Sequence, residues 1–242
     1  MSKTALITGS AKRLGKEMAI HLASLGWNIA IHYNRSESDA KLFQDQLASG
    51  YPGQQFELFQ VDLGQLDEVE QLISKVFATM GTIDLLINSA SVFEPSKLNL
   101  TTTDLFDRHM NINFKVPFIL SRNFAHTFDS GVIVNIVDSR IVTNQSNYAA
   151  YSLSKKALWE MTKMAAFEFG PEIRVNAIAP GLILAPEDKT EDYLWKLAGN
   201  IVMKRPGGLK PVLTSLDYIL ENDYLTGQLL FCDGGENLGL TK

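Results

Sequence analysis

The stretch "TALITGSAKRLGKEM", residues 4–18, reads as a strand, a tight turn and the first part of a helix. Its apolar run ends at Thr8-Gly9, and helical spacing of apolar residues begins near Gly15. Glycine lets the backbone turn sharply, and the N-terminus of the following helix offers free N–H groups and the positive end of its dipole. The stretch therefore predicts a βα turn suited to a phosphate group. We expect this turn to be formed by Gly9, Arg13, Leu14 and Gly15.

The glycines of this turn do not follow the common dinucleotide-binding pattern G-x-G-x-x-G. They follow T-G-x-x-x-R-x-G, with Arg13 where a further glycine is expected. Two glycines after a strand also occur in ordinary βα turns, which is the alternative interpretation of the stretch. Its place at the head of a long strand–helix alternation favours phosphate binding.

Short apolar runs alternate with helical segments along the rest of the chain, with clear helical spacing at 14–26, 66–81 and 152–170. Parallel strands need a crossover connection, so this alternation predicts βαβ units. We expect an α/β fold: one Rossmann-like, doubly wound domain over residues 1–242, with a seven-stranded parallel sheet flanked by helices. A flap over the site is expected at about 181–210, which is long, charged and rich in Pro and Gly. The expected strands are 4–8, 28–33, 56–61, 83–88, 131–137, 173–178 and 228–232.

Composition argues against several classes of protein. The net charge of −5 gives no reason to expect nucleic acid as a partner. The single cysteine, Cys232, allows no internal disulfide, and the four histidines lack metal-ligand spacing, so no metal site is expected. No apolar run approaches the length of about 20 residues that spans a bilayer, and the first residues leave no room for a signal peptide. We therefore expect a cytoplasmic protein without a membrane partner.

The end of the second expected strand predicts which dinucleotide the chain binds. An enzyme that prefers NAD usually carries an acidic residue there, which accepts from the ribose hydroxyl groups. Here the stretch reads "IHYNRSESD", residues 31–39, and arginine and serine are suited to a ribose phosphate. We expect NADP(H), although Arg35 could also be an ordinary solvated turn residue. The predicted contacts are Asn34, Arg35 and Ser36.

Further cofactor contacts are expected where the next strands end. Asp62 follows the third strand in "QVDL" and is placed to meet the adenine. The fourth strand ends in "INSAS", residues 87–91, where small residues allow close approach to the cofactor. From this stretch we expect Asn88 and Ala90 to contact the cofactor.

Tyr151 and Lys155 are four residues apart and so share one face of an expected helix. A nearby ammonium favours the phenolate, so we expect Lys155 to lower the pKa of Tyr151 and ease proton exchange near neutral pH. Such a pair also arises by chance in many helices. Its position after the fifth strand, with Asp138 at that strand's end and Asn113 upstream, favours catalysis.

This combination resembles the short-chain dehydrogenase/reductase family over nearly the whole chain. The resemblance implies that Tyr151 is the acid–base, that Lys155 also binds the cofactor ribose, and that Asn113 helps to hold a proton-relay water. A serine that polarises the substrate carbonyl is usual in the family, and this sequence has Asp138 in its place. The residues that carry the resemblance are Thr8-Gly9, Gly15, Asp62, "NSAS" 88–91, Asn113, Tyr151, Lys155 and the cofactor-contacting pair Pro180-Gly181.

Within the family, the sequence is most similar to the pteridine reductases and the related dihydromonapterin and dihydrofolate reductases. Arg13, "HYNRS" 32–36, "SASVFEPS" 89–96 and Asp138 carry this likeness. It implies that Phe93 stacks on a pterin and that Arg13 reaches both cofactor phosphates and pterin. A carboxylate repels a developing oxyanion but accepts bonds from ring N–H groups. We therefore expect NADPH-dependent reduction of a dihydropterin, with Arg13, Phe93, Asp138 and Tyr151 binding it.

Other interpretations stay open. A carbonyl reductase of the same superfamily, such as a 3-oxoacyl-thioester reductase, is the nearest alternative, and a non-catalytic NADP(H)-binding regulator is another. Asp138 could simply bond backbone or pair with Arg140, and Phe93 could be ordinary core. The resemblance also implies a homotetramer built through segments 101–128 and 152–170, with a dimer as the alternative.

Overall fold

The computed structural model describes residues 2–186 and 189–239. Its centre is a seven-stranded sheet in the order β3-β2-β1-β4-β5-β6-β7, with every neighbouring pair parallel. The predicted Rossmann-like, doubly wound sheet is thus confirmed. The strands are β1 (Thr4–Ile7), β2 (Asn28–Tyr33), β3 (Phe56–Gln60), β4 (Leu85–Asn88), β5 (Gly131–Ile136), β6 (Ile173–Pro180) and β7 (Leu229–Cys232).

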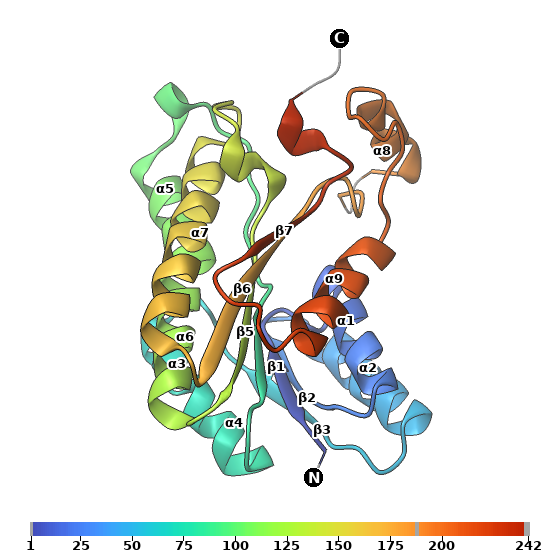
Figure 1. Ribbon diagram of the computed structural model, residues 1–242, viewed down its shortest axis with the longest axis vertical. Coiled ribbons are helices and arrows are strands. Elements are labelled where there is room, and N and C mark those ends of the chain that lie inside the picture. The colour runs from blue at the N-terminus through green and yellow to red at the C-terminus, as the bar shows by residue number, and fades with distance from the viewer. Residues whose placement is uncertain (1, 187–188, 240–242) are drawn as a thin grey trace.

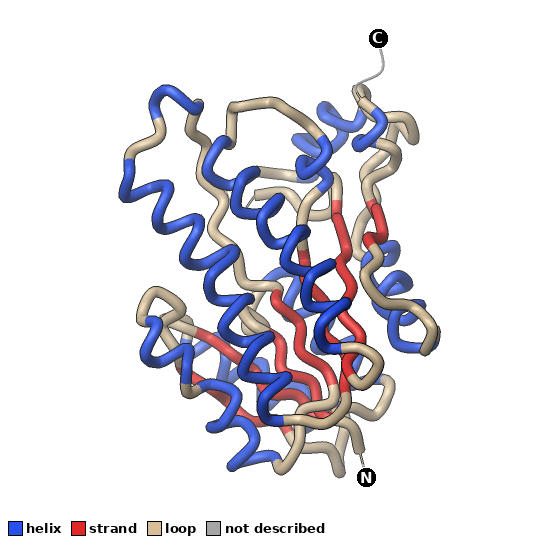
Figure 2. The backbone as a smooth tube through the Cα atoms, turned by 60° about the vertical axis from the view of Figure 1, so that its left-hand side comes forward, coloured by secondary structure: helices blue, strands red, loops and turns tan. Residues whose placement is uncertain are grey.

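Helices cover both faces of the sheet (Figure 1). One face carries α1 (Arg13–Ser24), α2 (Glu37–Gly50) and α9 (Lys210–Glu221), and α8 (Glu191–Ala198) lies beyond the sheet on that side. The other carries α3 (Leu66–Glu70), α4 (Leu72–Met80), α5 (Thr103–Met110), α6 (Val116–Thr127) and α7 (Ala149–Phe169). Figure 2 shows this second helical layer in front of the strands.

Alternation along the strands divides the core between the two faces. Ile7 and Ile31 pack with the α1 side, whereas their neighbours Leu6 and Ala30 pack with the α4 and α6 side. Successive side chains of a strand point to opposite faces, so a sheet covered on both faces needs near-continuous apolar strands. This is why the apolar runs located the strands so closely.

Two expected helices differ in their bounds. The segment 66–81 is two helices, because the N–H of Gln71 donates to the carbonyl of Glu68, three residues back, and tightens the turn there. The helix expected at 152–170 begins earlier, at Ala149, so Tyr151 lies in its first turn. Among the described residues no helix combines the length and the apolar character needed to cross a membrane.

Candidate active site

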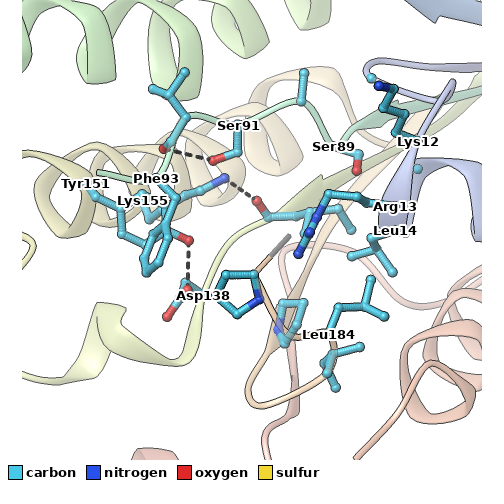
Figure 3. A pocket seen from close by; sticks show the side chains of 18 of the residues that line it. Lys12, Arg13, Leu14, Ser89, Ser91, Phe93, Asp138, Tyr151, Lys155 and Leu184 are labelled. Atoms are coloured by element: carbon cyan, nitrogen blue, oxygen red, sulfur yellow. Dashed lines mark hydrogen bonds between the residues drawn. The ribbon is translucent and has the colours of Figure 1, made fainter. Parts of the chain in front are cut away.

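A cavity of about 650 Å³ opens at the carboxyl ends of the strands. It is lined by the loops that follow the first six strands, by Tyr151 and Lys155 of α7, by part of segment 181–197 and by Glu236. This is where open parallel α/β sheets bind ligands, because the chain connections diverge beside β1. Figure 3 shows Asp138, Tyr151 and Lys155 gathered on one side of the cavity and Arg13 on the other.

The turn after β1 leaves no space for side chains at its two glycines. Gly9 has a φ of +69°, and a Cβ on it would lie 3.3 Å from the Cα of Ala90. A Cβ on Gly15 would lie 2.5 Å from the carbonyl oxygen of Gly9. Arg13, with a φ of 52°, starts α1, and its Nη2 donates to the carbonyl of Ala185 at 3.0 Å. The turn therefore presents bare backbone to the cavity.

The buried His32 supports this turn, although the sequence analysis did not single it out. Its Nδ1 accepts from the N–H of Gly9 at 2.9 Å, so Nε2 carries the proton and donates to the carbonyl of Val61 at 3.1 Å. Burial lowers the pKa of His32 from 6.5 to about 4, which keeps the ring neutral. A polar residue inside a buried strand must find hydrogen-bond partners, and that was the available signal.

Of the predicted ribose and adenine contacts, three line the cavity and one does not. Asn34, Ser36 and Asp62 line the cavity, and Asn34 Nδ2 donates to Asp62 Oδ1 at 3.1 Å. The loop of Asp62 is held by a further bond from the N–H of Gly64 to the same oxygen at 2.9 Å. Arg35 is exposed and lies outside the lining.

Of the two cofactor contacts expected at the end of β4, one lines the cavity and the other lies below it. Ala90 lines the cavity, and the hydroxyl of Thr8 accepts from the N–H groups of Ser89 and Ala90 at 2.9 and 3.0 Å. The side chain of Asn88 is buried below and donates to Asn135 at 2.8 Å, so it does not reach the cavity. Of the remaining predicted contacts, Leu14, Pro180 and Gly181 all belong to the lining.

Asp138 joins the end of β5 to the start of α7. Its Oδ2 accepts a hydrogen bond from the Tyr151 hydroxyl at 2.7 Å, and its Oδ1 accepts from the N–H of Arg140 at 2.8 Å. The carboxylate of Asp138 therefore accepts hydrogen bonds from the backbone and from Tyr151 at the same time. The ammonium of Lys155 donates instead to the carbonyl of Ile136 at 2.8 Å.

The expected lowering of the pKa of Tyr151 was wrong. Burial, the negative charge of Asp138 and the hydrogen bond to it raise the pKa of Tyr151 well above its usual value. The ammonium lies 5.9 Å from the centre of the tyrosine ring, and burial lowers the pKa of Lys155 to about 8. Because the nearest charge to the hydroxyl is a carboxylate, Tyr151 is a neutral hydrogen-bond donor.

Asn113 lies fully buried in a π-helical turn, Asn111–Lys115, between α5 and α6. Its side chain accepts from the N–H of Val92 at 2.8 Å and donates to the carbonyl of Val92 and to Ser154 at 3.0 and 3.1 Å. It thereby ties the loop after β4 to α7 and lies outside the cavity lining. A role in holding a relay water stays a prediction.

Phe93 lies at the rim of the cavity, with 46% of its surface exposed. Its ring stacks on Tyr148 with centroids 4.4 Å apart and meets the edge of Tyr151 at 4.7 Å. The guanidinium of Arg140 lies 4.7 Å from the centre of the Tyr148 ring. The same guanidinium lies 5.8 Å from the centre of the Phe93 ring, and the exposed part of Phe93 leaves an apolar surface at the rim of the cavity.

Comparison with known proteins identifies the family. The model of the short chain dehydrogenase family matches residues 3–192. The chain belongs to the short-chain dehydrogenase family. The solved structure of FolM alternative dihydrofolate reductase 1 from Brucella canis, complexed with NADP, is similar at 33% identity and a TM-score of 0.90, covering 99% of this chain and 96% of that one.

Two relatives of known name illustrate the range of activities in this short-chain dehydrogenase family. Dihydromonapterin reductase from Enterobacter sp. (strain 638) is 27% identical over 96% of both chains. The 3-oxoacyl-[acyl-carrier-protein] reductase FabG from Staphylococcus epidermidis (strain RP62A) is 26% identical over 97% of this chain and 99% of the relative. Their similar identities leave the substrate to be argued from the site.

In this short-chain dehydrogenase the cavity also includes residues that the sequence analysis missed. Tyr148, Ser139 and Glu236 line it, and Glu236 comes from the segment after β7. None of them belongs to a short-range motif that would have marked it. No group of three or more His, Cys, Asp or Glu side chains suited to a metal ion occurs in the parts of the chain that the structure describes.

Proposed function

We propose that this short-chain dehydrogenase reduces a dihydropterin of the dihydromonapterin, dihydrobiopterin or dihydrofolate type to its tetrahydro form with NADPH. The observation that carries the proposal is the 2.7 Å hydrogen bond from Tyr151 to Asp138 inside the cavity. The similarity to a dihydromonapterin reductase and to a FolM dihydrofolate reductase supports it.

The cavity fits NADP(H). The glycine turn after β1 suits the pyrophosphate, because it precedes a helix N-terminus and both of its glycines are closely packed. A Cβ on Gly15 would collide with the carbonyl oxygen of Gly9, and a Cβ on Gly9 would make a tight contact with Ala90. The Brucella relative is a complex with NADP, which supports the same cofactor here. When bound, NADPH supplies a hydride. The residues proposed to hold it are Gly9, Arg13, Leu14, Gly15, Asn34, Arg35, Ser36, Asp62, Ala90, Lys155, Pro180 and Gly181.

Asp138 favours a pterin over a carbonyl substrate. A carboxylate at this place repels the oxyanion that develops on a reduced carbonyl, so it opposes that reaction. A pterin presents ring N–H groups and an amine, which are donors that Asp138 can accept. Tyr151, with its raised pKa, keeps its proton until a basic ring nitrogen develops beside it.

The substrate ring is proposed to lie against the exposed part of Phe93, which packs against Tyr151 and lies on the same side of the cavity as Asp138 in Figure 3. Ring stacking of this kind tolerates different pterin side chains. Arg13 extends from the opposite side of the cavity, where its guanidinium contacts segment 181–197 at Ala185. Leu184 and Tyr193 contribute to the lining, and we propose that the segment at about 181–210 acts as the flap that selects the pterin. Residues 187 and 188 of this segment lie outside the described residues.

We further propose a cytoplasmic homotetramer. The helices α6 and α7 carry exposed apolar side chains on segments 101–128 and 152–170, among them Phe118, Leu153 and Phe167. Burying them between subunits would remove a large apolar surface from water. Analytical ultracentrifugation decides the state, and a monomer at micromolar concentration would contradict the proposal.

The deciding experiment is NADPH oxidation by the purified protein with dihydromonapterin, dihydrobiopterin, dihydrofolate and a 3-oxoacyl thioester, with NADH as the control cofactor. Turnover confined to pterins supports the proposal. Turnover of the thioester alone would identify the chain as a carbonyl reductase, in agreement with its similarity to FabG. Binding of NADPH without any turnover favours a non-catalytic regulator.

A further inference from the structure

A second carboxyl group reaches the cavity from the end of the chain. Glu236 follows β7 in a short 3-10 turn, Glu236–Leu238. Its Oε2 accepts a hydrogen bond from the hydroxyl of Ser139 at 3.0 Å, a contact between residues 97 apart in the sequence. Ser139 is buried and directly follows Asp138. The hydroxyl of Ser139 thus lies within hydrogen-bond distance of two acidic side chains, those of Glu236 and Asp138.

The turn that carries Glu236 is held firmly in place. Asp233, itself buried, accepts from the N–H of Gly235 at 3.0 Å and from the N–H of Asn237 at 2.7 Å. At Gly181 a Cβ would lie 3.0 Å from Glu236 Oε2, so the glycine leaves room for the carboxyl group. The chain therefore specifies where this carboxyl group lies.

Side-chain oxygen atoms follow one another at hydrogen-bond distances from Glu236 to Tyr151. The Ser139 hydroxyl is 3.0 Å from Glu236 Oε2 and 3.5 Å from Asp138 Oδ1. The other oxygen of Asp138 accepts from Tyr151 at 2.7 Å. When Glu236 is protonated, it can donate to Ser139 while the hydroxyl turns its own hydrogen to Asp138.

We propose that Glu236 is the entry point of a proton relay that runs through Ser139 and Asp138 to Tyr151. The inference rests on the proposed function, because it concerns the proton that this reduction consumes. The side chain of Asn113, which is bonded to Val92 and Ser154 and lies outside the cavity lining, takes no part in this relay.

Each turnover balances one hydride and one proton. NADPH, when bound, would supply the hydride for the ring carbon of the substrate C=N bond. Tyr151 gives its proton to the nitrogen and is left as a phenolate. Asp138, both of whose oxygens accept hydrogen bonds in the structure, receives a proton at Oδ1 from Ser139. Its carboxyl group then turns and returns this proton to the Tyr151 phenolate. Glu236 restores Ser139, and water restores Glu236. Each residue of the relay gives one proton and receives one, so the net consumption is one solvent proton.

The charges around Glu236 support its protonated form. Burial raises the pKa of Glu236, and so do the negative charges of Asp138 and Asp233, whereas the bond from Ser139 and the charge of Arg140 lower it. The net direction is upward. A carboxylic acid with a raised pKa is a better proton donor near neutral pH than an ordinary glutamate.

Three variants test the relay: Glu236→Gln, Ser139→Ala and the conservative Ser139→Thr, which keeps a hydroxyl. Glu221→Gln, an exposed glutamate at the end of α9, is the matched control for loss of one charge. Glu236→Gln and Ser139→Ala are expected to lower kcat by about tenfold or more, with the substrate KM changed by less than about twofold. Ser139→Thr should regain most of kcat, and Glu236→Ala should be rescued by added acetate.

A measurement without substrate separates the relay from the proposed function. The isotope-labelled carboxyl carbons of Asp138 and Glu236 are titrated by NMR. The pKa of Glu236 is expected to fall in Asp138→Asn, because one neighbouring negative charge is removed, and to change in Ser139→Ala. If neither substitution changes the pKa of Glu236, the relay is overturned, even if the protein reduces no substrate that is tested. Unchanged kcat and pH profile in Glu236→Gln and Ser139→Ala overturn it with any accepted substrate, pterin or thioester.

Discussion

The N–H of Gly9 donates to the Nδ1 of His32 at 2.9 Å, so a buried strand side chain fixes the glycine turn that borders the cavity. The bond requires a neutral imidazole, because a protonated ring has no acceptor. The stability of the turn is thereby tied to the protonation of one buried group.

Acid is expected to destabilise the protein through His32. Its pKa is 6.5 when unfolded and about 4 when folded, so the unfolded state binds more protons between these values. Stability is then fully present above pH 6.5 and is lost as the pH falls toward 4. The loss at the acidic end is on the order of 3 kcal/mol. Urea unfolding at a series of pH values measures it.

His32→Gln separates this contribution from those of other groups, since its amide oxygen can accept from Gly9 but does not titrate. The difference between the two stability curves should show the slope between pH 4 and 6.5. His126→Gln, at an exposed histidine, should follow the wild-type curve. Parallel curves for wild type and His32→Gln would refute the assignment.

Gly15→Ala is expected to weaken NADPH binding by about tenfold or more, because its Cβ would lie 2.5 Å from the carbonyl oxygen of Gly9 and force the turn to shift. Fluorescence titration with NADPH measures the Kd. Gly50→Ala is the control: no atom lies within 4 Å of its added Cβ. The control should bind NADPH normally and unfold at the same or a slightly higher temperature.

Asp138→Ser is expected to lower kcat/KM for a dihydropterin by about a hundredfold, since Tyr151 loses the carboxylate that it bonds at 2.7 Å. The Kd for NADPH should stay within about threefold, because the two shortest hydrogen bonds that Asp138 accepts come from Tyr151 and from the neighbouring Arg140. Steady-state kinetics and NADPH titration give both numbers. Full dihydropterin turnover by the serine variant would remove Asp138 from the mechanism.

Arg35→Ala tests the cofactor preference. Arg35 is exposed, so its attraction for a ribose phosphate acts through water and should weaken with added salt. The ratio of kcat/KM for NADPH to that for NADH should fall by about tenfold or more, with the NADH value unchanged. An unchanged ratio would mean that Asn34 and Ser36, which line the cavity, select the cofactor by themselves.

The fold was largely predictable because buried parallel strands are apolar on both sides. Each expected strand lies within a few residues of the observed one, as at Asn28–Tyr33. The break at Gln71 was not predictable, since both halves of segment 66–81 carry helical spacing of apolar residues. Sequence spacing reports which face is buried and says little about a single tightened turn.

The site was predictable where short motifs end strands or share a helix turn, as for Gly9, Asp138 and Tyr151. The prediction failed for contacts between distant segments, such as that of Glu236 with Ser139. The direction of the Tyr151 pKa also depended on three-dimensional detail. Spacing placed Lys155 on the same helix face, but only the structure shows its ammonium turned to the carbonyl of Ile136.

The contact between Ser139 and Glu236 has a consequence for biosynthesis. Strands β1 to β6 can pair before the residues that follow Pro180 are made, because β6 ends at Pro180. The acidic cluster cannot form until residue 236 has left the exit tunnel and docked. A nascent chain can thus form the glycine turn after β1 before Glu236 reaches Ser139, so the proposed relay is the last part of the site to be assembled.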